Sequence, residues 1–125
     1  MTASQAKSVL VVDDSRLSRM LISKYIATLH PHWIVNEANS GQEGIDKAKQ
    51  QSPDYITMDY NMEGISGMDA AKHILQFAPR AKIVLFSANV QASIVAEAKA
   101  MGIAFVGKPV TEITMQQALD YFASL

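Results

Sequence analysis

Five polar side chains, each directly after an apolar segment, have types that could together bind and receive a phosphoryl group. Asp13 and Asp14 follow one apolar run, Asp59 follows a second, and Ser87 and Lys108 follow two later ones. Three carboxylates held close together repel one another, and a bound divalent cation relieves that repulsion. An all-oxygen ligand set favours Mg²⁺ over zinc. A carboxylate can also accept a phosphoryl group itself, as an aspartyl phosphate.

Each of these side chains also has an ordinary structural explanation. Adjacent acids can place negative charge at a helix N-terminus, an Asp can begin a turn, and a Ser can cap a helix. A lysine can simply be solvated. What distinguishes the set is its position, because four of the five apolar runs in the chain end on such a residue and only the second contributes none.

The segments that would position these residues alternate between strand and helix. Apolar, β-branched runs predict the strands, and helical spacing bounded by Pro, Gly and capping residues predicts the helices. The predicted strands are 8–12, 33–38, 55–58, 83–86 and 104–107. The first predicted helix begins at 15, and the second ends at about 51. The third and fourth predicted helices span 68–77 and 91–101, and the last runs from 111 to the terminus.

Three of these helices carry more specific expectations. The first helix is expected to end at Pro31, and the residues that fall at helical spacing along its predicted face are Leu17, Met20, Leu21, Lys24 and Tyr25. At the start of the second helix, Ser40 and Glu43 have the spacing of a capping box. In the third helix, the inner face is expected to carry Ala71, Ile74 and Leu75.

Five βα repeats in sequence predict an α/β fold with a parallel sheet, right-handed crossovers and helices on both faces. The carboxyl ends of parallel strands share one edge of the sheet. This edge is where open α/β sheets bind ligands. The fold therefore brings the five polar side chains together, which favours the phosphoryl site over five separate ordinary explanations.

Composition narrows the function further. With 125 residues, 49% hydrophobic and 18% charged, the chain is expected to form one folded domain. A net charge of -1 argues against a sequence-independent grip on nucleic acid or anionic lipid. The absence of cysteine excludes disulfides and thiolate chemistry, and fits a reducing cytoplasm. The first residues are too polar for a signal peptide, and no apolar run approaches the roughly 20 residues of a membrane span.

Four motifs, in order and spacing, resemble those of CheY-like receiver domains of bacterial two-component response regulators. They are Val11-Val12-Asp13-Asp14, Met58-Asp59-Tyr60-Asn61-Met62, Ser87-Ala88 and Lys108-Pro109. The resemblance covers nearly the whole chain and implies a flavodoxin-like (βα)5 doubly wound sheet with strand order 2-1-3-4-5. It implies a single receiver domain over residues 1–125, with residues 1–7 as a flexible lead. Whether the chain stands alone or belongs to a longer regulator stays open.

The resemblance also implies a role for each site residue. Asp59 would be the phosphoacceptor. The implied ligands of Mg²⁺, for which Mn²⁺ could substitute, are the carboxylates of Asp13, Asp14 and Asp59 and the backbone carbonyl of Asn61. The implied phosphoryl ligands are Lys108, Ser87 and the backbone N–H of Ala88. The Lys108–Pro109 bond is expected to be cis, which proline permits at low cost.

A switch and several partners follow from the same resemblance. The phosphoryl group would come from a phosphohistidine of a sensor histidine kinase or phosphotransfer protein. Ser87 would then move toward it and Phe105 would turn inward, which reshapes the face of the fourth helix, fifth strand and last helix. That face would bind a downstream protein, an output domain or a second copy of the chain, without direct contact to nucleic acid or membrane. The chain would catalyse only its own phosphorylation and dephosphorylation.

The sequence departs from the family pattern at several positions near the site. Glu63 stands where many receivers carry proline, so it either adds negative charge near the metal or faces solvent. Phe105 lacks the hydroxyl of the commoner tyrosine, and Ala88 leaves the site open to a phosphodonor. Asn61 and Asn89 occupy positions that tune dephosphorylation in this family, in a direction that the sequence does not give.

Three other functions are compatible with parts of the pattern. A flavodoxin shares the fold, but its flavin phosphate would meet Asp13 and Asp14 where a hydroxyl-rich loop is needed. A phosphatase with an aspartyl phosphate intermediate would need a second acid at the position of Asn61, and a cap to enclose its substrate. A degenerate receiver would serve as a docking module only, which the intact set of acids disfavours.

Overall fold

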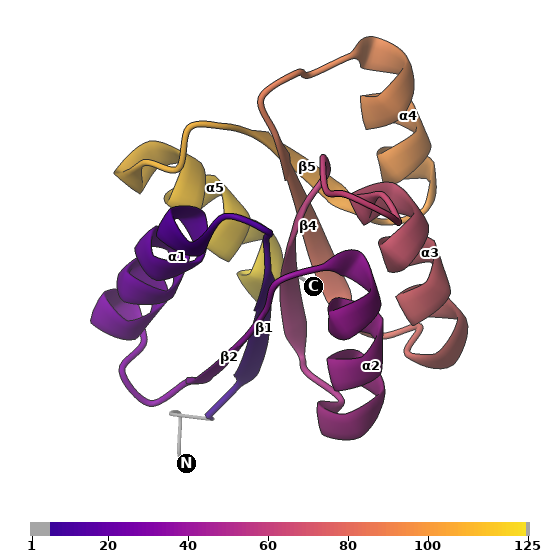
Figure 1. Cartoon of the computed structure of the whole chain (residues 1–125). Coiled ribbons are helices and arrows are strands. Elements are labelled where there is room, and N and C mark those ends of the chain that lie inside the picture. The colour runs from indigo at the N-terminus through magenta and orange to yellow at the C-terminus, as the bar shows by residue number, and fades with distance from the viewer. Residues whose placement is uncertain (1–5, 125) are drawn as a thin grey trace.

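The computed structural model describes residues 6–124 and contains one parallel sheet of five strands (Figure 1). The strands are β1 (Ser8–Val12), β2 (Ile34–Ala38), β3 (Tyr55–Asp59), β4 (Lys82–Ser87) and β5 (Ala104–Gly107). Their order in the sheet is β2-β1-β3-β4-β5. The α/β class, the parallel pairing and the 2-1-3-4-5 order are therefore confirmed.

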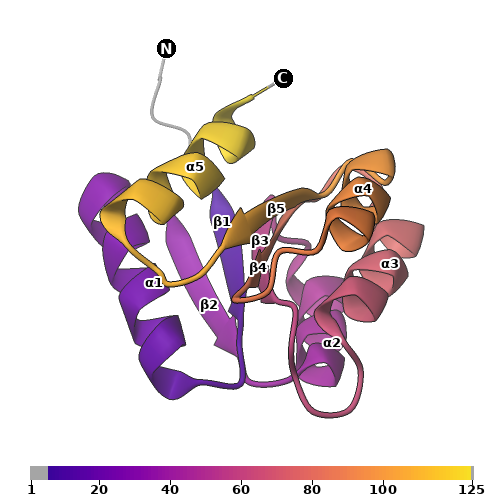
Figure 2. The same cartoon turned by 90° about the horizontal axis from the view of Figure 1, so that it is seen from above.

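Five helices cover the two faces of the sheet. They are α1 (Arg16–Leu29), α2 (Gly41–Gln51), α3 (Gly67–Phe77), α4 (Ala92–Ala100) and α5 (Glu112–Ala123). Seen from above, α1 and α5 lie on one side of the sheet, and α2, α3 and α4 lie on the other (Figure 2). This is the doubly wound arrangement that alternating strands and helices require.

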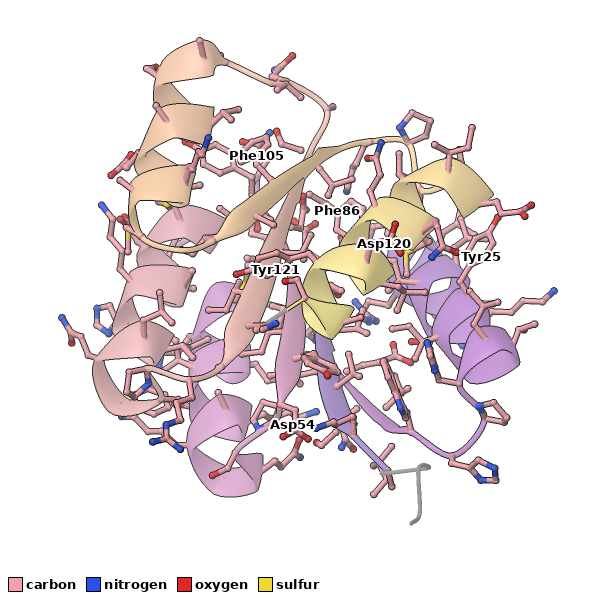
Figure 3. The ribbon with its side chains drawn as sticks, turned by 180° about the vertical axis from the view of Figure 1, so that it is seen from behind. Tyr25, Asp54, Phe86, Phe105, Asp120 and Tyr121 are labelled. Atoms are coloured by element: carbon pink, nitrogen blue, oxygen red, sulfur yellow. The ribbon has the colours of Figure 1, made fainter. Side chains whose placement is uncertain are left out.

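Alternation along the strands creates a separate apolar core under each helix layer. Leu10, Ile56 and Leu85 are fully buried on the side of α2, α3 and α4. Val84 and Phe86 are buried on the side of α1 and α5 (Figure 3). Because successive side chains of a strand point to opposite faces, strands buried on both faces must be apolar throughout.

The strand register brings the ends of the strands to one level. Val12 pairs with Met58, so Asp13, which follows β1, lies beside Asp59, the last residue of β3. Asp59 pairs with Phe86, and Ser87 pairs with Gly107. The acids after β1, the acid that ends β3, the hydroxyl that ends β4 and the lysine after β5 therefore reach the same edge.

Most predicted boundaries lie within one or two residues of those in the structure, and at the helix starts the capping residues explain the difference. Ser15 is the N-cap of α1 rather than its first residue, because its side chain accepts a hydrogen bond from the N–H of Ser18. Ser40 caps α2 by accepting from the N–H of Glu43 at 3.0 Å. The Glu43 carboxylate accepts from the N–H of Asn39 at 2.6 Å, one residue earlier than a capping box predicts.

One prediction about α1 is wrong, whereas the inner face predicted for α3 is confirmed. Most of the predicted face of α1 points outward, with Leu17 65% exposed and Met20 55% exposed, although Tyr25 packs against the core. The helix instead packs on the sheet through Ile22 and Ile26. A helix with two apolar stripes offers two possible inner faces, and periodicity alone does not choose between them.

Two further predictions concern the N-terminal residues and the absence of membrane-spanning segments. A flexible lead is predicted for residues 1–7, of which residues 1–5 lie outside the described part of the chain. The first strand, β1, begins at Ser8. None of the helices within residues 6–124 is long and apolar enough to cross a bilayer.

Candidate phosphoryl and metal site

Three carboxylates converge at the carboxyl edge of the sheet. One oxygen from each of Asp13, Asp14 and Asp59 lies within 4.8 Å of the other two. Asp13 is 1% exposed and Asp59 is 6% exposed, whereas Asp14 is open to solvent. The predicted convergence of the acids is therefore confirmed, with two acids in the floor of the site and one at its rim.

The loop after each strand fixes the backbone of its acid. The N–H of Asp13 donates to the carbonyl of Ala38 at 3.1 Å, and its Oδ1 accepts from the N–H of Ser15 at 2.9 Å. Beyond Asp59, the N–H of Tyr60 donates to the carbonyl of Phe86 at 2.8 Å. These backbone bonds tie both acids to neighbouring strands and to the first turn of α1.

Gly67, where α3 begins, lets the loop after Asp59 return against β3. A Cβ at Gly67 would lie 2.1 Å from the carbonyl oxygen of Asp59 and 2.8 Å from the Cα of Tyr60. The N–H of Gly67 also donates to the carbonyl of Tyr60 at 2.9 Å. Its sequence marks the segment as a loop, but this close backbone approach is visible only in the structure.

Lys108 supplies the positive charge of the site. Its Nζ lies 3.3 Å from Oδ1 of Asp59 and 3.4 Å from Oδ2 of Asp13. Its backbone N–H donates to the carbonyl of Ser87 at 2.8 Å, which ties the loop after β5 to β4. The Lys108–Pro109 bond is cis, as predicted.

The surroundings of Asp59 disfavour its ionised form. Burial, reinforced by the charge on Asp13, raises the pKa of Asp59 from 3.8 to about 6, although Lys108 acts in the opposite direction. For Lys108, burial lowers the pKa, but the charges of Asp13 and Asp59 outweigh it and the net shift is upward. The lysine thus stays charged, while the acid beside it is partly protonated near pH 6.

The two predicted switch residues lie next to the acids without joining them. Ser87 is 1% exposed, and its Oγ bonds both the N–H and the carbonyl of Asn89 at 3.1 Å. Phe105 is half-buried on β5, on the α4 side (Figure 3), with its ring centroid 6.2 Å from that of Tyr60. Tyr60, directly after Asp59, was not singled out in the sequence, because no pattern marks a cross-strand aromatic contact.

The remaining predicted positions are at the rim. Asn61, Ala88 and Asn89 are exposed around the acids, open to a ligand approaching from solvent. Glu63 is also exposed, so of its two predicted effects the structure favours a side chain that faces solvent.

The donor set fits a hard divalent cation. Three carboxylates with oxygens within 4.8 Å and no histidine or cysteine among them match the preference of Mg²⁺ for oxygen ligands. Burial, reinforced by the charge of Asp13, raises the pKa of Asp59, so an additional positive charge at the site would favour the ionised carboxylate.

A parallel 2-1-3-4-5 sheet with two acids after β1, one at the end of β3 and a lysine after β5 defines a receiver domain. The family profile of the response regulator receiver domain matches residues 9–120. Because that match spans most of the chain, the protein belongs to the response regulator receiver family, the family that the motifs resemble.

Relatives of known name and structure agree with this assignment. The chemotaxis protein CheY of Thermotoga maritima is 39% identical over 115 residues, which are 91% of this chain and 95% of that protein. The response regulator domain of Thermotoga maritima CheB is 33% identical with a TM-score of 0.78, covering 95% of this chain and 92% of that one. The chemotaxis protein CheY4 of Vibrio cholerae is 25% identical with a TM-score of 0.81, covering 93% and 98%.

Proposed function

We propose that the chain is a phosphorylation switch whose acceptor is Asp59. One observation carries the proposal: the Asp59 carboxylate is 6% exposed and lies 3.3 Å from the Lys108 ammonium, beside two further acids. A lone structural acid would not need such neighbours. An acceptor does, because the incoming phosphoryl oxygens require positive charge and a fixed orientation.

In this proposal the residues of the site divide the work of the transfer. An oxygen of Asp59 bonds to phosphorus while the phosphorus–nitrogen bond of a phosphohistidine breaks, and the imidazole nitrogen keeps the electron pair. Lys108 binds a phosphoryl oxygen, as do Ser87 and the N–H of Ala88 once they reach it. Asp13, Asp14, Asp59 and the carbonyl of Asn61 would hold Mg²⁺, or Mn²⁺ in its place. When bound, the cation supplies charge neutralisation.

Intact mass measurement after incubation with a small acyl phosphate and Mg²⁺ tests the acceptor. Wild type should gain one phosphoryl group, whereas Asp59→Asn and a Mg²⁺-free sample should gain none. Wild type that stays unmodified while a control receiver is modified would instead support the docking module.

An apolar groove beside the acceptor supports a protein, rather than a metabolite, as the natural phosphodonor. The groove is a cavity of about 410 Å³ next to the site, lined by Leu17, Ser18, Leu21, Ala88, Lys108, Pro109 and Val110. Since Lys108 belongs both to the groove and to the site, a partner seated there reaches Asp59. We propose a sensor histidine kinase or phosphotransfer protein as that partner.

A substitution in the groove should slow phosphoryl transfer from protein donors without affecting transfer from small-molecule donors. Leu21→Glu should slow transfer from a panel of purified phosphohistidine kinases at least tenfold, and leave modification by a small acyl phosphate unchanged. Phe77→Glu on α3 is the matched control, because Phe77 is 40% exposed and Leu21 is 38% exposed. Equal rates for Leu21→Glu and wild type with every kinase would place the docking surface elsewhere.

We further propose that Ser87 and Phe105 pass the signal to the α4–β5–α5 face. Ser87 would exchange its two bonds with Asn89 for the phosphoryl group, and Phe105 would turn toward the vacated space. The altered face would then bind a downstream protein, an output domain or a second copy of the chain. Ser87→Ala and Phe105→Ala should each abolish phosphorylation-dependent binding, and unchanged binding in both would refute this route.

The rest of the proposal concerns the extent of the domain, its location in the cell and its lack of an external substrate. We propose that the whole chain, residues 1–125, is one receiver domain that acts in the cytoplasm and turns over no external substrate. The cysteine-free composition fits a reducing compartment. Steady turnover of small phosphate esters, lost in Asp59→Asn, would contradict the last point.

A further inference from the structure

Arg19 joins three separate parts of the chain next to the acids. This residue lies on α1, and its side chain is 15% exposed. Its Nη1 donates to the backbone carbonyl of Asp13 at 2.7 Å, and its Nε donates to Oε1 of Glu37, on β2, at 3.0 Å. A single guanidinium thus bridges the turn that carries the first two acids and the neighbouring edge strand.

Other contacts hold the far end of this bridge. Lys47, on α2, donates to the backbone carbonyl of Glu37. The Ser23 hydroxyl lies 3.5 Å from Oε2 of Glu37. On the other side, the N–H of Asp13 bonds the carbonyl of Ala38 at 3.1 Å. The N–H and the carbonyl of Asp13 are therefore both tied, directly or through Arg19, to β2. The second strand, which delivers no side chain to the site, contributes to it in this indirect way.

We propose that Arg19 is a positioning residue for the acid site: it fixes the backbone of Asp13 so that the carboxylates of Asp13 and Asp14 converge on Asp59. This inference rests on the proposed function, in which those acids hold Mg²⁺. Carboxylates within 4.8 Å repel one another and push the turn apart when no cation is bound. A planar fork with two fixed bonds resists that displacement, and groups behind metal ligands commonly set metal affinity in this way.

Three possible roles of Arg19 predict different changes in Mg²⁺ affinity. If Arg19 acts only as a nearby positive charge, its removal strengthens Mg²⁺ binding, because like charges repel. If Arg19 only staples α1 to β2, its removal lowers the melting temperature and leaves Mg²⁺ affinity unchanged. If it positions the acids, its removal weakens Mg²⁺ binding.

Calorimetric titration of the full chain with Mg²⁺ alone distinguishes these roles. We expect the dissociation constant to rise about tenfold in Arg19→Gln. It should rise nearly as much in Arg19→Lys, since an ammonium cannot reproduce the two-bonded fork. Lys72→Gln is the matched control, because it removes the exposed Lys72–Glu97 pair between α3 and α4, and it should leave Mg²⁺ affinity unchanged.

Several outcomes would overturn the inference. Unchanged or tighter Mg²⁺ binding in Arg19→Gln, or wild-type affinity in Arg19→Lys, would show that the fork does not position the acids. Should Arg19→Gln fail to fold, by circular dichroism, Arg19→Lys alone decides. Failure of the proposed function looks different, because wild type itself would then bind no Mg²⁺ and take no phosphoryl group.

Discussion

At the amino-terminal edge of the sheet, charged side chains complete backbone hydrogen bonds, whereas at the carboxyl edge they face one another. Asp54, which precedes β3 at the lower edge in Figure 3, accepts the N–H of Ser8 at 2.9 Å. Lys82, at the start of β4, donates to carbonyls in the last turn of α5, at 3.4 Å from Tyr121 and 3.3 Å from Phe122. Both charges stabilise the fold where they stand.

At the opposite edge, Asp13 also accepts a backbone N–H, that of Ser15 at 2.9 Å, but the acids there mainly face one another. The Asp59 carboxylate lies within 4.8 Å of those of Asp13 and Asp14, and one ammonium is shared between two of the three. Burial, and after it the charge of Asp13, raises the pKa of Asp59, so the surroundings disfavour the ionised carboxylate in spite of Lys108. The comparison teaches that one edge is built for stability and the other retains unsatisfied charge that a ligand can relieve.

Neutralising Asp59 should give the largest effect on this comparison. In Mg²⁺-free buffer at pH 7.5, Asp59→Asn should be more stable than wild type by about 2 kcal/mol, since it removes a charge that its surroundings disfavour. Thermal or urea unfolding measures the difference. Asp54→Asn makes the same change at the amino edge, where the charge already has a backbone partner, and should give no such gain. A less stable Asp59→Asn would mean that Lys108 outweighs the repulsion.

Lowering the pH should erase the advantage of Asp59→Asn. The pKa of Asp59 is raised from 3.8 to about 6, so between these values the folded chain binds more protons than the unfolded chain. Stability from this group therefore rises as the pH falls through 6 toward 4. The gap between wild type and Asp59→Asn should be full at pH 7.5 and mostly gone near pH 4.5. A gap that stayed constant would show that charge is not its cause.

Removing Lys82 tests the amino edge. Lys82→Met keeps much of the apolar stem but deletes the ammonium that binds the last carbonyls of α5, and should cost about 1 to 2 kcal/mol. Urea unfolding gives the loss, and the rate of phosphorylation by a small acyl phosphate should not change. Lys72→Met, in an exposed pair with Glu97, is the control and should cost less stability than Lys82→Met. A slower phosphorylation in Lys82→Met would couple the two edges.

The sequence predicts the carboxyl edge better than it predicts the helices around it. Apolar runs ending on Asp13, Asp59 and Lys108 locate the site, because a parallel sheet leaves their side chains no other edge. The inner face of α1 differs from the prediction, since Leu17, Met20 and Leu21 on its outer side are also apolar and periodicity does not choose between them and Ile22 and Ile26.

The contacts that organise the acids have no signature in the sequence. Arg19 binds a backbone carbonyl, which every residue carries, so nothing in the residue type of Asp13 announces the contact. Gly67 is necessary only because β3 ends against it, a fact of tertiary packing. Sequence patterns predict which side chains gather, but the distances that make them a site depend on backbone contacts between segments far apart in the chain.

The smallest expected change in stability is for a substitution at Thr57, which lies deeper in the sheet than the acids. This side chain is fully buried in β3 between Val11 and Val84, two residues before Asp59, and among residues 6–124 its hydroxyl has no hydrogen-bond partner. A buried hydroxyl without a partner is costly, so the nearly isosteric Thr57→Val should stabilise the chain by about 1 kcal/mol in urea unfolding.

The same substitution at Thr114 should have the opposite sign, because that hydroxyl bonds the carbonyl of Pro109 at 2.9 Å and caps α5. Both outcomes together would show that polar groups without a hydrogen-bond partner occur inside the sheet at Thr57 as well as among the charged acids at its carboxyl edge. A loss of stability in Thr57→Val would instead mean that the hydroxyl is satisfied in solution by a buried water. The unsatisfied groups would then be confined to the charged rim, where a cation can reach them.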